Sequence, residues 1–293
     1  MSLPLNDPKR FKRFYATSQR IRELNEARER FSHPHIDFPK WALEGIQWRG
    51  DERILDIGCG YGAYYERLIE RHPDIQYFGI DLSEGMLRQH PAYETGRLAF
   101  GEATQLPFAN ETFDVVMANN MLYHIPDVEA AIREVKRVIK PDGVMMAATH
   151  SIQTMPELRM LIRRAIIILT RANPSSVRPP MTVSDLFSLE TGTRFLSRYF
   201  YGVCRFEIPT TLVFHNENDF LGYLDNLRDL LELYLPPDVT WEGVQEVLRE
   251  QVAQFIHQLG DMQVSRLAGV LIATNRGGFL RDFMRVRAES DQS

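Results

Sequence analysis

Hydrophobic positions between residues 53 and 149 form short apolar runs that alternate with amphipathic segments. Five such runs predict buried strands, at residues 53–57, 76–80, 98–100, 113–117 and 144–148. Residues 128–139 carry apolar side chains at three- and four-residue spacing, after Asp127 and before Pro141, which predicts an amphipathic helix with Asp127 as its N-cap. This alternation predicts an α/β protein whose doubly wound, mainly parallel sheet is covered by helices on both faces.

The pattern divides the chain into four segments. Residues 1–50 carry apolar side chains at helical spacing and predict a helical N-terminal extension. Residues 51–150 hold the alternating core, and residues 151–280 complete the sheet. The last segment, residues 281–293, is a polar tail.

A late insertion interrupts the second half of the sheet. Strands are predicted at residues 201–208 and 211–215, and a closing strand at residues 268–273. Between them, residues 216–260 carry two periodic apolar stripes joined at Pro236-Pro237, which predicts a helical hairpin. Both stripes need a packing partner. Either the hairpin roofs a binding site as a lid, or its stripes are covered by each other, by the sheet or by a second copy of the chain.

Composition excludes several classes of protein. The chain is 44% hydrophobic and 25% charged, as globular proteins are. Its net charge of −5 argues against nucleic-acid binding. Two cysteines allow no disulfide framework, and the longest apolar run, residues 165–169, is too short for a membrane span. With no signal-like start, these features predict a cytoplasmic protein that acts away from membranes, and no metal site is predicted.

Glycines gather where the first core strand ends. The sequence Ile54-Leu-Asp-Ile-Gly-Cys-Gly-Tyr-Gly62 places glycine at every second position after the strand. Glycines there allow a tight turn and close approach of the backbone to a ligand at the strand ends. The spacing differs from the dinucleotide fingerprint G-x-G-x-x-G, and a purely structural turn remains the alternative.

Polar residues follow the next three strands. Asp81 ends the second strand, where a carboxylate can accept hydrogen bonds from both hydroxyls of a ribose. Alternatively Asp81 caps the following helix, although Ser83 is available for that role. Glu102 follows the third strand, either near an adenine amino group or as an exposed loop acid, and Asn119 ends the fourth strand.

With these motifs in this order, residues 53–149 resemble a class I S-adenosylmethionine-dependent methyltransferase, in the broad group that includes the UbiE-like and small-metabolite enzymes. The resemblance implies a seven-stranded Rossmann-like sheet with an N-terminal helical extension. It also implies S-adenosyl-L-methionine as cofactor and a small-molecule acceptor. The reaction expected is in-line methyl transfer that releases S-adenosylhomocysteine.

The resemblance also implies a cofactor site, carried over by position. Its expected members are Gly58, Cys59, Gly60 and Gly62 beneath the methionine part, Asp56 at that loop or at the cofactor's ammonium, Asp81 at the ribose, Leu82, Glu102 and Ala103 around the adenine, and Asn119 facing the methionine part. One departure stands at position 102, where the family more often has aspartate.

Two histidines are candidate catalytic bases, His124 and His150, each near the carboxyl end of a strand. A packed or hydrogen-bonded histidine is the alternative, favoured for His124. Two other functions share the predicted fold. One is a nicotinamide-dependent oxidoreductase, and the other is a catalytically silent protein that binds S-adenosylmethionine.

Overall fold

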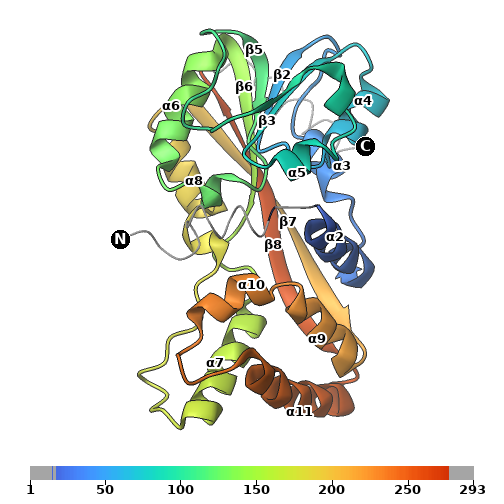
Figure 1. Cartoon of the computed structure of the whole chain (residues 1–293), viewed down its shortest axis with the longest axis vertical. Helices are drawn as coiled ribbons and strands as arrows, with labels where there is room; N and C mark the ends of the chain where they lie inside the picture. The colour runs from blue at the N-terminus through green and yellow to red at the C-terminus, as the bar shows by residue number, and fades with distance from the viewer. Residues whose placement is uncertain (1–14, 16–17, 277–293) are drawn as a thin grey trace, which may run out of the picture.

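One mixed sheet of eight strands runs through the protein in the order β1-β7-β8-β6-β5-β2-β3-β4 (Figure 1). The structure is a computed structural model, which describes Tyr15 and residues 18–276. The strands are β1 (Ser32–His33), β2 (Arg53–Ile57), β3 (Gln76–Asp81), β4 (Leu98–Phe100), β5 (Phe113–Met117), β6 (Ile139–His150), β7 (Gly202–Phe214) and β8 (Met262–Thr274). Residues 1–14 of the predicted N-terminal extension and the predicted tail, residues 281–293, lie outside the described part.

Neighbouring strands from β4 to β6 are parallel, and β8 is antiparallel to both β6 and β7. This confirms the predicted doubly wound, mainly parallel α/β sheet. The expected number of seven strands is wrong, because Ser32 and His33 pair antiparallel with Leu212 and Thr211 at the edge. Two residues are too few to show strand periodicity in a sequence.

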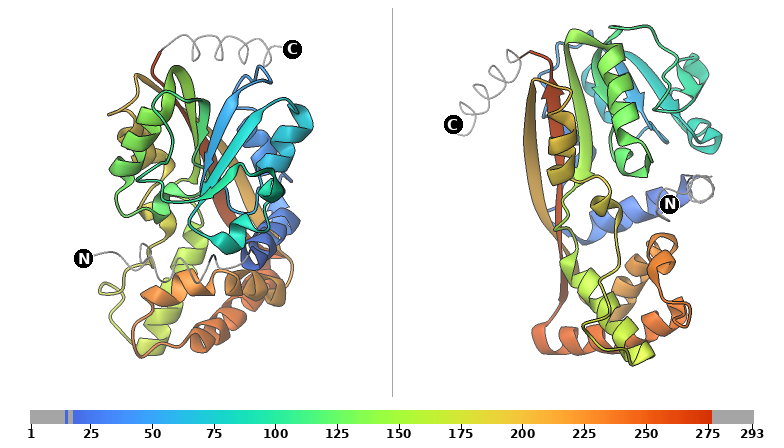
Figure 2. Two further views of the ribbon diagram at one scale, coloured as in Figure 1. Left: turned by 45° about the horizontal axis from the view of Figure 1, so that its top comes forward. Right: turned by 90° about the vertical axis from the view of Figure 1, so that its left-hand side faces the viewer.

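Helices cover both faces of the sheet (Figures 1 and 2). Their bounds are α2 (Gln19–Phe31), α3 (Phe38–Leu43), α4 (Tyr65–Arg71), α5 (Glu84–Leu87), α6 (Val128–Val138), α7 (Pro156–Thr170), α8 (Leu189–Leu196), α9 (Glu217–Asp225), α10 (Arg228–Leu231) and α11 (Trp241–Leu259). Ile132 of α6 and Leu189 of α8 are fully buried in the core on one face, and Leu43 of α3 and Leu68 of α4 are buried in the core on the other. Asp127 caps α6 as predicted, since its carboxylate accepts a hydrogen bond from the Ala130 N–H at 2.9 Å.

A second lobe, formed by α7, α9, α10 and α11, packs on the projecting ends of β7 and β8 (Figure 1). Its core joins Phe214 and Val264 of the two strands to Phe220 of α9 and Trp241 of α11, all fully or almost fully buried. The apolar stripes of the predicted hairpin are therefore covered largely inside this lobe.

Three predicted boundaries in this half of the chain are wrong. The two strands predicted between residues 201 and 215 form one strand, β7 (Gly202–Phe214). They join because β1 pairs only with positions 211 and 212 and leaves an open edge at Pro209, where proline is tolerated. Strand β8 begins at Met262 rather than residue 268, since its first half packs on the second lobe. The first hairpin helix ends at Asp225, whose carboxylate accepts hydrogen bonds from Trp241 and Gln245 of α11.

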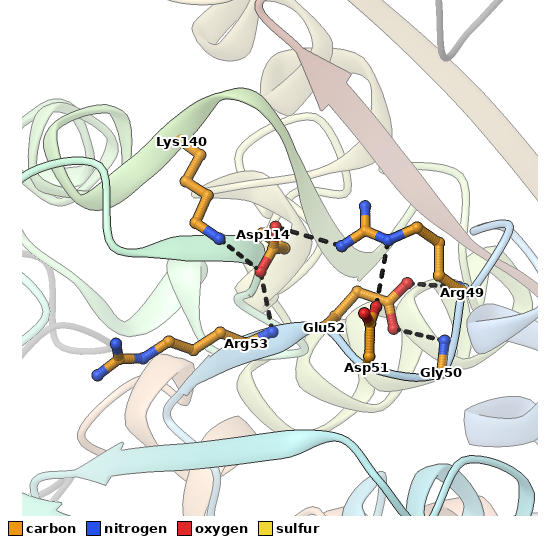
Figure 3. Close-up of polar contacts among 7 residues, drawn as sticks. All are labelled: Arg49, Gly50, Asp51, Glu52, Arg53, Asp114 and Lys140. Atoms are coloured by element: carbon orange, nitrogen blue, oxygen red, sulfur yellow. Dashed lines mark hydrogen bonds and ion pairs between the residues drawn. The ribbon is translucent and has the colours of Figure 1, made fainter.

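Charged groups at the amino end of the parallel strands are paired (Figure 3). The Asp114 carboxylate accepts hydrogen bonds from Lys140 Nζ at 2.9 Å, from the Arg53 N–H at 3.0 Å and from Arg49 at 3.4 Å. Partial burial alone would raise the pKa of Asp114, but these donors outweigh burial and hold that pKa below its usual value. The network joins the first residues of β2, β5 and β6.

Candidate active site

A cavity of about 770 Å³ lies at the carboxyl ends of β2, β3, β5 and β6. Its other walls come from α2, from Tyr15 and from Arg266 of β8. Figure 2 shows α2 crossing beside these strand ends, between the sheet core and the second lobe. Parallel α/β sheets bind ligands at this edge, so the fold itself marks the cavity as the candidate site.

Every predicted site residue except Gly62 lines this cavity. They are Asp56, Gly58, Cys59, Gly60, Asp81, Leu82, Glu102, Ala103, Asn119, His124 and His150. Gly62 instead supports the loop: its φ is +86°, and a Cβ there would lie 2.8 Å from Pro91 and 3.0 Å from His90. Sequence order thus locates a single site, although the role of each residue within it remains a prediction.

The glycine loop turns away from β2 with two positive φ angles at the cavity. Gly58 has φ +67° and Gly60 has φ +56°, conformations that glycine adopts without steric cost. A Cβ on Gly58 would meet Met121 at 2.8 Å, whereas a Cβ on Gly60 would meet nothing within 4 Å. Gly60 therefore leaves its backbone accessible to a ligand.

Asp81 spans the glycine loop and the turn after β3. Its carboxylate accepts hydrogen bonds from the Gly60 N–H at 2.9 Å and the Ser83 N–H at 2.8 Å. Burial raises the pKa of Asp81, although these backbone donors oppose the increase. The cap of α5 is the Ser83 hydroxyl, which accepts from the Met86 N–H, so Asp81 is not needed as the side-chain cap.

A second carboxyl group, Asp56, lies buried beneath the same loop. It accepts a hydrogen bond from the Tyr77 hydroxyl at 2.8 Å. Burial, and the nearby negative charge of Asp81, raise the pKa of Asp56 to about 7. Two carboxyl groups with raised pKa values at one wall suit a positively charged ligand, which would stabilise their ionised forms.

Exposed apolar side chains border the cavity next to Asp81. Leu82 is 40% exposed and Phe100 is 57% exposed, and both line the cavity. Ala103 is buried beside them, and Glu102 is exposed and accepts a hydrogen bond from Thr104 at 3.4 Å. Phe100 was missed in the sequence, although its place as the last residue of β4 could have indicated it.

An amide with an unpaired donor follows β5. Asn119 Oδ1 accepts a hydrogen bond from the Ala148 N–H at 3.0 Å. Its Nδ2 atom is buried with no hydrogen-bond partner among the residues that the structure describes. Because buried donors are rarely left unpaired, this amide indicates a place for a ligand acceptor.

The two candidate bases occupy different surroundings. The His124 Nε2 atom lies 2.6 Å from the Tyr15 hydroxyl, and burial lowers the pKa of His124 to about 3. Burial also lowers the pKa of His150 well below its usual value, with Arg28 and Arg266 adding to the effect. Both imidazoles are thus neutral at pH 7, and the contact between His124 and the Tyr15 hydroxyl favours a structural role for His124.

The predicted hairpin contributes little to the cavity wall. Of residues 216–260, only Leu230 of α10 lines the cavity, because α9 and α11 pack on the strand ends. Two arginines that the sequence did not indicate, Arg28 and Arg266, line it instead. Their positions 238 residues apart gave no local signal.

Known proteins resemble this chain over part of its length, including the core of the sheet. Residues 55–147 match the family model described as "Methyltransferase domain". The chain is 32% identical over 142 residues to malonyl-[acyl-carrier protein] O-methyltransferase of Methylococcus capsulatus, covering 46% of this chain and 51% of that protein. It is 27% identical over 177 residues to the mitochondrial arginine-hydroxylase NDUFAF5 of Danio rerio, covering 60% of this chain and 51% of that protein. The chain thus spans about half the length of these curated relatives.

The fold is also similar to that of a solved structure, the YcgJ protein of Bacillus subtilis. That similarity has a TM-score of 0.51 at 19% identity and covers 83% of this chain and all of the other. Residues 55–147 thus match a methyltransferase domain, as the order of motifs in the sequence predicted.

Proposed function

We propose that this protein binds S-adenosyl-L-methionine in the cavity and transfers its methyl group in line to a small organic acceptor, releasing S-adenosylhomocysteine. The observation that carries the proposal is the position of Asp81, which lies beside Gly60 at the carboxyl edge of the sheet, within the matched domain. A carboxylate at this point is suited to the two ribose hydroxyls of an adenosine.

The cavity residues fit such a cofactor along its length. Leu82, Phe100 and Ala103 would enclose the adenine, with Glu102 at its edge. The open space over Gly60 and the unpaired Asn119 Nδ2 would accommodate the methionine part. Asp56 would face its ammonium group, whose charge would favour the ionised carboxylate.

The bound cofactor would supply a methyl group on a sulfonium that is already electrophilic. The chain's own residues would therefore mainly position the acceptor and exclude water, rather than activate the methyl group. Positive charge at sulfur decreases toward the transition state, so strong stabilisation of the sulfonium alone would slow transfer. Of the two histidines, His150 would lie on the acceptor side of the cavity, and His124 would position Tyr15.

Calorimetry with S-adenosylmethionine, S-adenosylhomocysteine and NAD tests the proposal. We expect both sulfur ligands to bind at one site and NAD not to bind. An acceptor screen with detection of S-adenosylhomocysteine then separates methyl transfer from hydroxylation, the reaction named for one relative. Binding of NAD without binding of S-adenosylhomocysteine would refute the proposal.

A further inference from the structure

Two arginines that line the cavity have no acidic partner within the described part of the chain. Arg28 of α2 and Arg266 of β8 both line the cavity, as does His150 at the end of β6. Each arginine donates a hydrogen bond to a neutral side chain, Arg28 Nη1 to Asn25 Oδ1 at 3.4 Å and Arg266 Nη1 to Ser32 Oγ at 3.4 Å. The Nε atoms of both arginines are buried and have no hydrogen-bond partner in the described part of the chain.

The two guanidinium groups are close enough to affect each other and His150. Burial, together with the charge of Arg28, lowers the pKa of Arg266 to about 10. Both arginines also disfavour a proton on His150, whose buried Nδ1 atom has no partner within the described residues. Burying like charges together without a counter-ion costs free energy, which a bound anion would recover.

Another arginine of the same cavity shows the contrast. Arg67 Nε lies 3.2 Å from Asp37 Oδ2, so its charge is balanced within the protein. Among the strands that line the cavity, the carboxyl groups of Asp56 and Asp81 thus lie on β2 and β3, whereas His150 lies on β6 and the guanidinium group of Arg266 lies on β8.

An apolar pocket of about 80 Å³ adjoins the cavity beside Arg28. It shares Arg28, His150 and Leu230 with the large cavity. Most of its remaining wall is apolar, with Ile162 of α7 and Leu231 of α10 among its residues. A ligand anion held between the arginines could thus extend an apolar chain between α7 and α10.

Building on the proposed function, we propose that the methyl acceptor is a carboxylic acid with an apolar chain, anchored by Arg28 and Arg266. The two oxygens of a carboxylate match two guanidinium groups, and such charge-assisted hydrogen bonds are strong when water is excluded. A phosphate would present a third oxygen and a second charge. The apolar chain would lie in the small pocket beside Leu230.

Calorimetry on the full chain loaded with S-adenosylhomocysteine tests this inference, with octanoate, octanamide, acetate and octyl phosphate as probes. We expect octanoate to bind at least tenfold more tightly than its neutral amide, than acetate and than octyl phosphate. Arg28→Gln and Arg266→Gln should each weaken octanoate binding at least tenfold, and Arg266→Lys should weaken it less. All variants should bind S-adenosylhomocysteine within about twofold of the unchanged protein.

The matched control is Arg30→Gln, because Arg30 lies on the same helix, outside the cavity, and pairs with Asp219. It should leave every affinity unchanged. Circular dichroism checks folding, and Arg28→Gln on α2 provides the test if the β8 variant does not fold.

Several results would overturn the inference while leaving the proposed function intact. These are equal binding of octanoate and octanamide, tighter binding of octyl phosphate, or loss of S-adenosylhomocysteine affinity in Arg28→Gln with octanoate binding unchanged. The last result would assign Arg28 to the carboxylate of the cofactor. Failure of the unchanged protein to bind S-adenosylhomocysteine would instead refute the proposed function itself.

Discussion

At the amino end of the parallel strands, Asp114 accepts hydrogen bonds from donors of three segments. At the carboxyl end, Asp56 and Asp81 line the cavity, and neither has a cationic partner among the residues that the structure describes. Burial acts on the carboxyl groups of both ends. It is outweighed by donors at Asp114 and dominates at Asp56 and Asp81. The amino end therefore uses charge to stabilise the fold, and the carboxyl end keeps costly charge that a ligand could compensate.

The largest expected effect concerns Asp56 and stability. Its pKa rises from 3.8 to about 7 on folding, so the folded state binds this proton more tightly than the unfolded state does. The stabilisation is fully present below about pH 3.8 and is lost as pH rises through about 7. Relative to Asp56→Asn, the ligand-free protein should therefore lose up to roughly 4 kcal/mol of unfolding free energy between these limits.

Urea denaturation of both proteins at pH 5, 6, 7 and 8 measures this difference. Because the comparison is between two proteins at each pH, other titrating groups largely cancel. A difference that stays constant from pH 5 to pH 8 would contradict the burial of an ionisable Asp56.

The second effect concerns ligand affinity at Asp81. Asp81→Ala should weaken S-adenosylhomocysteine binding by about 1.5–3 kcal/mol, because hydrogen bonds to a charged acceptor are lost. Calorimetry measures the dissociation constant, and Asp114→Asn is the control from the opposite end of the sheet. An unchanged dissociation constant in Asp81→Ala would show that Asp81 does not bind the ligand and serves only to hold the backbone of Gly60 and Ser83.

The third effect concerns Asp114 at the amino end of the strands, where a substitution should change stability and not ligand affinity. Asp114→Asn should lower the free energy of unfolding by about 1–2 kcal/mol, since the amide replaces a carboxylate that accepts charged hydrogen bonds. Affinity for S-adenosylhomocysteine should not change. Chemical denaturation and calorimetry on one preparation test both statements, and a weakened affinity would show that the two ends are coupled.

The smallest effect separates the contacts of Asp114 from one another. Arg49 is largely exposed and lies 3.4 Å from Asp114, so Arg49→Gln should change stability by no more than about 0.5 kcal/mol. Lys140→Gln, which removes the 2.9 Å contact, serves as the comparison and should cost more. Equal losses in the two variants would mean that distance to Asp114 does not determine the contribution.

The carboxyl end was predictable from sequence because its residues follow directly after recognisable strands. Asp81 and Asn119 are fixed in space by the strands that precede them, and parallel strands bring their carboxyl ends together. The core strands and the cap at Asp127 were predictable for the same local reason.

Other features depend on contacts that no local pattern records. Arg28 has the surroundings of a solvent-exposed helical arginine in the sequence, and only the position of α2 across the strand ends brings it to Arg266. The edge strand β1 and the continuation of β7 through Pro209 depend likewise on pairing between distant segments. The break of the predicted first hairpin helix depends on Asp225 contacting α11.

The ladder between β7 and β8 has a consequence for how molecules enter and leave. These strands pair continuously from Gly202 with Thr274 to Phe214 with Met262, and they run from the sheet core into the second lobe. A hinge that swung the lobes apart would have to bend or break this ribbon, losing a backbone hydrogen bond at each disrupted pair. Helix α2 lines the same cavity, and its buried residue, Leu24, packs in the core of the second lobe. We therefore expect exchange of the proposed cofactor and product to depend on movement of α2 rather than on separation of the lobes, so that changes in α2 should alter the rate of product release.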